Sequence, residues 1–152
     1  MRRVVIGVGN PDRGDDGAGP AVARVLSARV PPGVTVTHAH GEPTSLMAAW
    51  ADADAVFIID ACTSGAEPGT ITRFVAHEAP LPEYFQALST HGFGLGAAIE
   101  FARALDALPK SVVVYGVEAM SFEPCSALSP AVASAVETVA AAVLDDVTGP
   151  PA

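Results

Sequence analysis

The chain of 152 residues has the length of one compact domain, because domains typically contain about 100–200 residues. Half of the residues are hydrophobic, 16% are charged and the mean hydropathy is +0.38, so intrinsic disorder is excluded except at the ends. Seventeen acidic residues against eight basic ones give a net charge of −9, which repels nucleic acid and anionic lipid. The expected partners are therefore neutral or basic, including basic proteins.

Cysteine usage and hydropathy predict a cytoplasmic protein. The two cysteines, Cys62 and Cys125, are far apart and form no CxxC pattern, and no charged-then-apolar signal peptide opens the chain. The longest helix-like apolar stretch, residues 131–144, contains polar residues and is shorter than the roughly 18 residues that a membrane span needs. We therefore expect reduced thiols and no membrane-crossing segment.

The first half of the chain alternates predicted strands and helices. A short β-branched run at residues 3–8 predicts a strand that is buried on both faces. After a turn, apolar residues at helical spacing predict an amphipathic helix that reaches Val30, with Pro20 tolerated in its first turn. Residues 34–37 alternate as a strand, and Thr44 is the expected cap of a short helix.

The second half continues the alternation. Residues 55–59 are the most hydrophobic strand candidate, residues 70–75 predict another strand, and a long loop follows over residues 77–88. The remaining predicted elements are a helix over residues 95–105, a buried strand over 112–117 and a closing helix from residue 130.

Strands that alternate with helices predict an α/β fold, a three-layer sandwich with a mostly parallel twisted sheet and helices on both faces. We expect a single domain over residues 1–147 and a frayed tail over residues 148–152. In sheets of this type ligands collect at the carboxyl ends of the strands. The loops at that edge therefore hold the candidate functional residues.

The turn after the first predicted strand contains two adjacent aspartates, Asp15 and Asp16. It superficially resembles a GxGxxG dinucleotide loop, but Asp12 occupies the position of the last glycine. Two carboxylates at the start of a helix would also repel a phosphate, so no nucleotide or flavin is expected there. The alternative role for either aspartate is to cap the helix, and it suits Asp15 better than Asp16.

Two further polar residues are predicted to reach the same edge. Asp60 ends a central strand, although it could instead accept hydrogen bonds from the amides of residues 61–64 in a turn. His91 precedes Gly-Phe-Gly in a loop before a helix, where a histidine is often merely solvated. Together Asp16, Asp60 and His91 form a set of hard oxygen and borderline nitrogen ligands suited to nickel or zinc, with open positions left over.

Several segments, taken together, resemble the [NiFe]-hydrogenase maturation proteases over nearly the whole chain. The segments are GVGNP (7–11), RGDDGAGP (13–20), DA (60–61), PGTI (68–71), STHGFGL (89–95), GVE (116–118) and LSP (128–130). Their order and spacing make the resemblance specific. It implies an α/β sandwich and an endopeptidase that removes the C-terminal extension of the hydrogenase large subunit precursor after nickel insertion, recognising the nickel bound by that substrate.

Carried over residue by residue, the resemblance makes Asp16, Asp60 and His91 the catalytic and metal-contacting set. It also implies that the substrate supplies the nickel, and no organic cofactor is expected. The net charge and the hydropathy predict that neither nucleic acid nor membrane is a partner. Several members of the family have glutamate where Asp16 stands, so the shorter side chain changes the reach but not the type of ligand.

The residues do not identify the general base. Neither cysteine has a nearby histidine in the sequence, and the chain has no GxSxG elbow and no HExxH helix. The hypothesis is therefore an aspartyl endopeptidase-like enzyme in which substrate-held nickel docks on three side chains and orients the scissile bond. The alternatives are a metallohydrolase that holds its own zinc through the same residues and a noncatalytic nickel-binding interaction module.

Other polar and aromatic residues have less specific roles. His38 and His40 form an H-x-H at a strand end, where solvated histidines are commoner than metal ligands. Glu118 either lines the same cleft or accepts hydrogen bonds from loop amides. Trp50 and Phe57 are expected in the core.

Overall fold

The computed structural model describes residues 1–85 and 94–150 and contains one five-stranded sheet. The strands are β1 (Arg3–Val8), β2 (Val34–Ala39), β3 (Ala55–Cys62), β4 (Ile71–Val75) and β5 (Ser111–Glu118). The α-helices are α1 (Ala18–Ser27), α2 (Pro43–Ala49), α3 (Leu95–Ala104) and α4 (Pro130–Thr148). Two short 3-10 helices, η1 (Gly14–Gly17) and η2 (Glu83–Phe85), lie before α1 and after β4.

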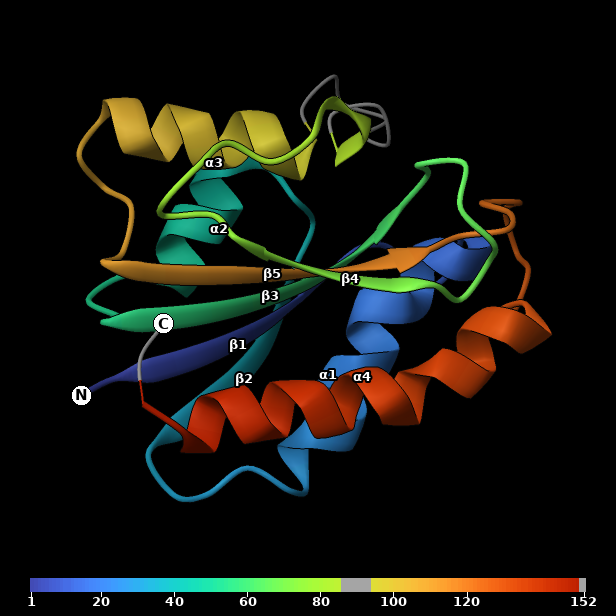
Figure 1. Cartoon of the computed structure of the whole chain (residues 1–152), viewed down its shortest axis with the longest axis horizontal. Coiled ribbons are helices and arrows are strands. Elements are labelled where there is room, and N and C mark those ends of the chain that lie inside the picture. Colours follow the sequence, from blue (N-terminus) through green and yellow to red (C-terminus); the bar gives the residue numbers. More distant parts are fainter. Residues whose placement is uncertain (86–93, 151–152) are drawn as a thin grey trace.

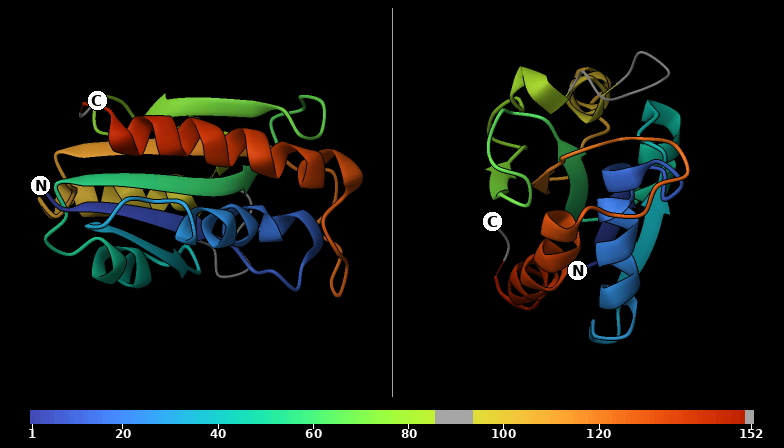
Figure 2. Two further views of the ribbon diagram at one scale, coloured as in Figure 1. Left: turned by 90° about the horizontal axis from the view of Figure 1, so that it is seen from below. Right: turned by 90° about the vertical axis from the view of Figure 1, so that its right-hand side faces the viewer.

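The sheet has the predicted mostly parallel arrangement. Its strand order is β2-β1-β3-β5-β4, with β1, β2, β3 and β5 parallel and β4 antiparallel at one edge. Helices α1 and α4 cover one face and α2 and α3 cover the other, so the three-layer α/β sandwich is confirmed (Figure 1, Figure 2). Among the described residues, none of the helices combines the length and the hydropathy of a transmembrane span.

Alternation along the strands divides the core between the two faces. In the register of β1, β3 and β5, Val4, Val56 and Val112 lie side by side and pack toward α2 and α3. The next row along each strand, which begins with Val5 and Phe57, packs toward α1 and α4. All residues of β3 and β5 are buried, which explains why their sequences are continuous hydrophobic runs.

Some helix boundaries differ from the sequence predictions. Helix α1 ends at Ser27 rather than reaching Val30, because the prolines that follow disfavour the helical conformation. The cap of α2 is Glu42 rather than Thr44, since Pro43 has no amide hydrogen to satisfy and takes the first helical position. Trp50 and Phe57 are core residues as predicted, and the Trp50 indole donates to the carbonyl of Ala107.

The ends of the domain are tied together at the amino edge of the sheet. Helix α4 continues through Thr148, and the Arg3 guanidinium donates to the carbonyl of Val147 in its last turn and to that of Gly149 just after it. An arginine at this place suits the negative end of the helix dipole. The described part of the predicted tail is therefore held against β1.

A contact between glycines sets the position of the first turn. A Cβ at Gly7 would lie 2.3 Å from the carbonyl oxygen of Gly19, so β1 and α1 approach backbone to backbone. A Cβ at Gly19 would lie 2.4 Å from the carbonyl oxygen of Val8 and 2.5 Å from that of Ile59. The start of α1 thus rests directly on the carboxyl ends of β1 and β3.

Gly19→Ala should destabilise the fold by about 2–3 kcal/mol or more, because the new methyl group would overlap backbone atoms that cannot move independently. Chemical denaturation followed by circular dichroism measures the change. Arg24→Ala, an exposed position on the same helix, is the control and should change stability by less than about 0.5 kcal/mol. A Gly19→Ala protein as stable as the wild type would contradict the close contact.

Candidate active site

The loops after β1, β3 and β5 meet at the carboxyl edge of the sheet (Figure 1). η1 follows β1, contacts β3 and carries Asp16, which is half-buried. Asp60 lies within β3, which continues to Cys62 instead of ending at Asp60 as predicted. The strand extends further because β5 pairs with it through Glu118.

Asp60 is a buried carboxyl group beside another carboxyl group. Burial and the negative charge of Asp16 raise the pKa of Asp60 well above its usual value, and a hydrogen bond from the Ala61 amide offsets this only in part. The η1 turn that carries Asp16 contacts β3, the strand that carries Asp60. The structure therefore brings the two elements that carry these residues together at one edge of the sheet, and convergence of the side chains within metal-sharing distance stays a prediction.

The turn holds Asp16 by backbone contacts. The amide of Asn10 donates to the Asp16 carboxylate at 2.8 Å, and a Cβ at Gly9 would lie 1.9 Å from the Asp16 carbonyl oxygen. Burial raises the pKa of Asp16, whereas the Asn10 hydrogen bond and the charge of Arg13 act in the opposite direction. The sequence analysis did not predict that Arg13 acts on Asp16. Its position three residues before Asp16, in the same turn, could have indicated this.

Asp15, next in sequence to Asp16, has a structural role. Its buried carboxylate accepts hydrogen bonds from the amides of Met120, Ser121 and Ser129 and from the Ser129 hydroxyl. Burial alone would raise the pKa of Asp15, but these hydrogen bonds outweigh it and lower the pKa. Ser129 precedes α4, so Asp15 secures the start of that helix rather than capping its own.

Glu118 has a similar role on the other side of the site. Its buried carboxylate accepts hydrogen bonds from the amides of Ser64 and Gly65, from the Ser64 hydroxyl and from the Cys62 thiol. The structural alternative, in which Glu118 is an acceptor for loop amides, is therefore the one observed. The Ser64 amide therefore donates to Glu118 and not to Asp60, as the turn interpretation of Asp60 had assumed.

The thiols do not form a nucleophilic centre. Burial and the neighbouring carboxylate of Glu118 raise the pKa of Cys62 to about 12, so this thiol stays protonated at neutral pH. Cys125 is exposed and free.

The predicted third ligand, His91, lies outside the described residues. Within residues 1–85 and 94–150, no three His, Cys, Asp or Glu side chains are grouped so that they could hold a metal ion. His38 and His40 are exposed at the end of β2 and just beyond it. The metal-contacting set of Asp16, Asp60 and His91 thus stays a prediction. The structure describes Asp16 and Asp60 but not His91.

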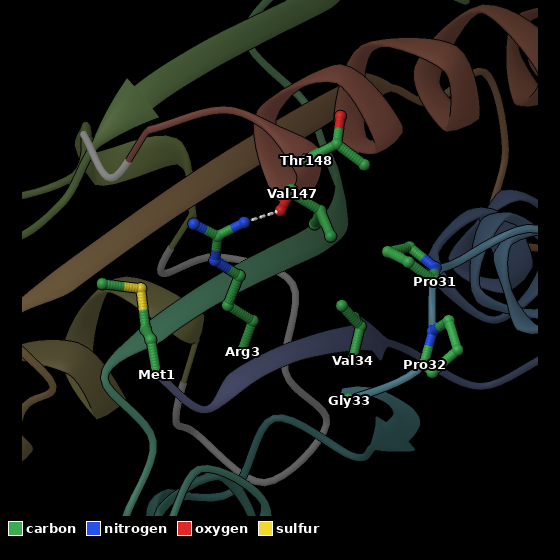
Figure 3. A pocket seen from close by; sticks show the side chains of 8 residues that line it. All are labelled: Met1, Arg3, Pro31, Pro32, Gly33, Val34, Val147 and Thr148. Atoms are coloured by element: carbon green, nitrogen blue, oxygen red, sulfur yellow. Dashed lines mark hydrogen bonds between the residues drawn. The ribbon is translucent and has the colours of Figure 1, made fainter.

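A cavity of about 290 Å³ opens at the opposite, amino edge of the sheet (Figure 3). It is lined by Met1, Arg3, Pro31, Pro32, Gly33, Val34, Val147 and Thr148. The Arg3 guanidinium in its wall already donates to the carbonyls at the end of α4. This cavity is separate from the paired aspartates and contributes no group to them.

Known proteins resemble this chain in sequence and fold. The family model described as hydrogenase maturation protease matches residues 20–146. The hydrogenase 2 maturation protease of Escherichia coli K12 is 29% identical over 148 residues, covering 95% of this chain and 89% of that protein. The structure of the hydrogenase maturating endopeptidase HybD from E. coli superposes with a TM-score of 0.80 at 30% identity, covering 95% of this chain and 90% of the other. The [NiFe] hydrogenase maturation protease HycI from Thermococcus kodakarensis superposes with a TM-score of 0.73 at 25% identity, covering 97% and 93%.

Asp15→Asn should lower the stability at pH 7 by about 2–3 kcal/mol, because the amide cannot replace a carboxylate that accepts four hydrogen bonds. The lowered pKa of Asp15 means that its contribution is present above the pKa of the unfolded chain and is lost as the pH falls. Denaturation at several pH values should therefore show the difference shrinking in acid. A constant difference would contradict this role.

Asp60→Asn should have the opposite effect and raise the melting temperature at pH 7. Because the pKa of Asp60 is raised in the folded state, the wild type loses stability as the pH rises above the ordinary aspartate value. The asparagine variant has no such loss, so the two proteins should be equally stable near pH 3 and diverge toward neutral pH. Calorimetry checks this, and a variant that is less stable at pH 7 would contradict the repulsion between the two aspartates.

Proposed function

Because this chain belongs to the hydrogenase maturation protease family, we propose that it removes the C-terminal extension of a [NiFe]-hydrogenase large subunit precursor after nickel has been inserted. The observation that supports this most is the pair of Asp16 and Asp60 at the carboxyl edge of the sheet. Two carboxyl groups that repel each other in a buried setting are typical of a site built for function rather than stability.

The paired carboxylates suit a cation that arrives with the substrate. Oxygen ligands from Asp16 and Asp60 leave further coordination positions for the groups by which the precursor already holds its nickel. A divalent ion would also relieve the repulsion that raises the pKa of Asp60, and its binding would release any proton that the pair holds. Recognition of nickel would thereby position the precursor beside the carboxylates.

His91 is the proposed third member of the set. The helices η2 and α3 flank residues 86–93, and both place buried residues in the core on the sheet face that also carries Asp60. Phe85 ends η2 and Leu95 begins α3. The elements on either side of this segment thus lie on the face of Asp60, which supports the proposal that His91 acts together with Asp16 and Asp60.

The cleavage step is proposed to be aspartyl endopeptidase-like. Cys62 is unsuitable as a nucleophile because its pKa is about 12 and its thiol donates to Glu118. We infer that one carboxylate of the pair, or the metal of the substrate, polarises water or the scissile carbonyl. No organic cofactor is needed for this hydrolysis. The free thiols agree with the proposed cytoplasmic location.

Asp60→Asn and His91→Ala should each slow processing of a nickel-loaded precursor by at least about 100-fold, because misplacing the substrate by an ångström can cost that much. The amide of Asp60→Asn keeps the shape of the side chain but removes the anionic ligand. Gel electrophoresis or mass spectrometry of the large subunit measures the removal of the extension. Cys62→Ala and Cys125→Ala are the controls and should process at close to the wild-type rate.

The same assay separates the alternatives. A metallohydrolase with its own zinc would also cleave nickel-free precursor, lose activity to a chelator and regain it with zinc. A noncatalytic interaction module would bind nickel-loaded precursor and leave it intact. Processing that survives both Asp60→Asn and His91→Ala, or that is lost in the cysteine variants while they remain folded, would contradict the proposed function.

A further inference from the structure

Arg13 directly precedes η1, three residues before Asp16, and its backbone is fixed on both sides. Its amide donates to the Asn10 carbonyl at 3.2 Å, and its carbonyl accepts from the Asp16 amide at 3.1 Å. The amide of Asp15 donates to the Ser121 carbonyl at 2.9 Å, which ties the same turn to the loop after β5. The base of the Arg13 side chain is therefore held in the turn that also holds Asp16.

The Arg13 side chain has hydrogen-bond donors that the described fold does not use. A guanidinium carries several N–H donors and no acceptor. Within residues 1–85 and 94–150, none of these donors reaches an acceptor and no ion pair includes Arg13, although Asp12 is its neighbour in the sequence. The residue is half-buried, and its Nε is buried without a partner. A buried donor without a partner costs free energy, and a catalytic role is one reason why such a group is kept.

Arg13 also brings a positive charge to loops whose other charged residues are acidic. It is the only arginine or lysine in the loops that follow the four parallel strands, which are residues 9–17, 40–42, 63–70 and 119–129. Burial raises the pKa of Asp16, and the charge of Arg13 acts in the opposite direction. In these loops, Arg13 is therefore the group that can stabilise negative charge on a bound molecule.

Hydrolysis of a peptide bond beside two carboxylates needs such a group. When water adds to the scissile carbonyl carbon, one proton of the water passes to a carboxylate and the carbon–oxygen π pair moves to the carbonyl oxygen, which becomes an oxyanion. On collapse the pair returns, the carbon–nitrogen bond breaks with its electrons on nitrogen, and the nitrogen takes up the proton. Carboxylates repel an oxyanion, whereas a cation with free N–H donors stabilises it.

We propose that Arg13 is a catalytic residue of the cleavage step, whose guanidinium donates to the carbonyl oxygen of the scissile bond and stabilises the oxyanion that forms there. This inference rests on the proposed function, which supplies the peptide bond and the paired carboxylates. The aspartates then orient the nickel-bearing precursor, and one of them accepts the proton of the water. The proposal explains why Arg13 is unpaired beside acidic neighbours, because an ion pair with Asp12 or Asp16 would occupy the donors that the precursor needs.

The experiment measures kcat and KM for cleavage of nickel-loaded precursor by the wild type, Arg13→Gln and Arg13→Lys. Arg13→Gln should lower kcat about 100-fold or more with KM nearly unchanged, because removal of one oxyanion donor typically costs roughly 10²–10³ in kcat. Arg13→Lys keeps the charge but loses the planar fork of donors, so its kcat should be intermediate. Arg24→Gln, at an exposed arginine on α1, is the matched control and should cleave at the wild-type rate.

Free guanidinium ion tests the contact directly. At concentrations far below those that unfold the protein, it should restore part of the kcat that Arg13→Ala loses, and sodium chloride of equal ionic strength should not. Asp60→Asn should gain nothing from guanidinium, because the group it lacks is a carboxylate. Melting temperatures establish that each variant is folded in the assay. The melting temperature of Arg13→Gln should stay close to that of the wild type, because the guanidinium makes no hydrogen bond within the described residues.

Three results would overturn the proposal: an Arg13→Gln enzyme with wild-type kcat, an Arg13→Lys enzyme as fast as the wild type, or an Arg13→Ala enzyme that guanidinium leaves inactive. Full activity of Arg13→Lys would mean that only the charge near Asp16 matters. These outcomes differ from failure of the proposed function. A wild type that leaves nickel-loaded precursor intact contradicts both proposals, whereas a wild type that cleaves beside an equally active Arg13→Gln contradicts this one alone.

Discussion

The backbone contact between Gly19 and the ends of β1 and β3 is the constraint on which the site depends. Because neither Gly7 nor Gly19 has a side chain, α1 starts directly on the carbonyl groups of Val8 and Ile59. The η1 turn, which immediately precedes α1, is thereby drawn onto the carboxyl edge of the sheet. The contact places η1, with Asp16, against β3, with Asp60, where burial and the charge of Asp16 together raise the pKa of Asp60.

The acidic residues at this edge, Asp15, Asp16, Asp60 and Glu118, differ in how many hydrogen bonds their carboxylates accept. Asp15 and Glu118 each accept hydrogen bonds from four donor groups and secure the loops on either side of the site. Asp60 is buried with the Ala61 amide as its donor and with Asp16 nearby, so its ionised form is disfavoured. The first kind of carboxylate stabilises the fold, whereas the second is destabilising until a cation or proton neutralises it. Asp15, Glu118 and Asp60 are all buried, so burial alone does not tell a stabilising carboxylate from a destabilising one.

The sequence predicted what depends on local pattern and sheet topology. Hydrophobic runs located the parallel strands, and the rule that ligands gather at their carboxyl ends predicted that Asp16 and Asp60 converge. The partners of Asp15 and Glu118 were not predictable, because the donors lie more than fifty positions away in the sequence. The extension of β3 through Asp60 likewise depends on pairing with β5, a long-range contact. His91 lies outside the described residues, so its role stays a prediction.

Under the proposed function, the repulsion between the aspartates has a use. A site that supplies two oxygen ligands and leaves the remaining positions open should bind a free ion weakly, since closed sites with four protein ligands hold metals tightly. The same pair is well suited to complete the coordination of an ion that another protein already holds. A precursor without nickel brings no charge to offset the repulsion between Asp16 and Asp60. On this proposal, the cost of ionising Asp60 beside Asp16 makes the site sensitive to whether the precursor carries nickel, because only a loaded precursor brings the cation that offsets the repulsion.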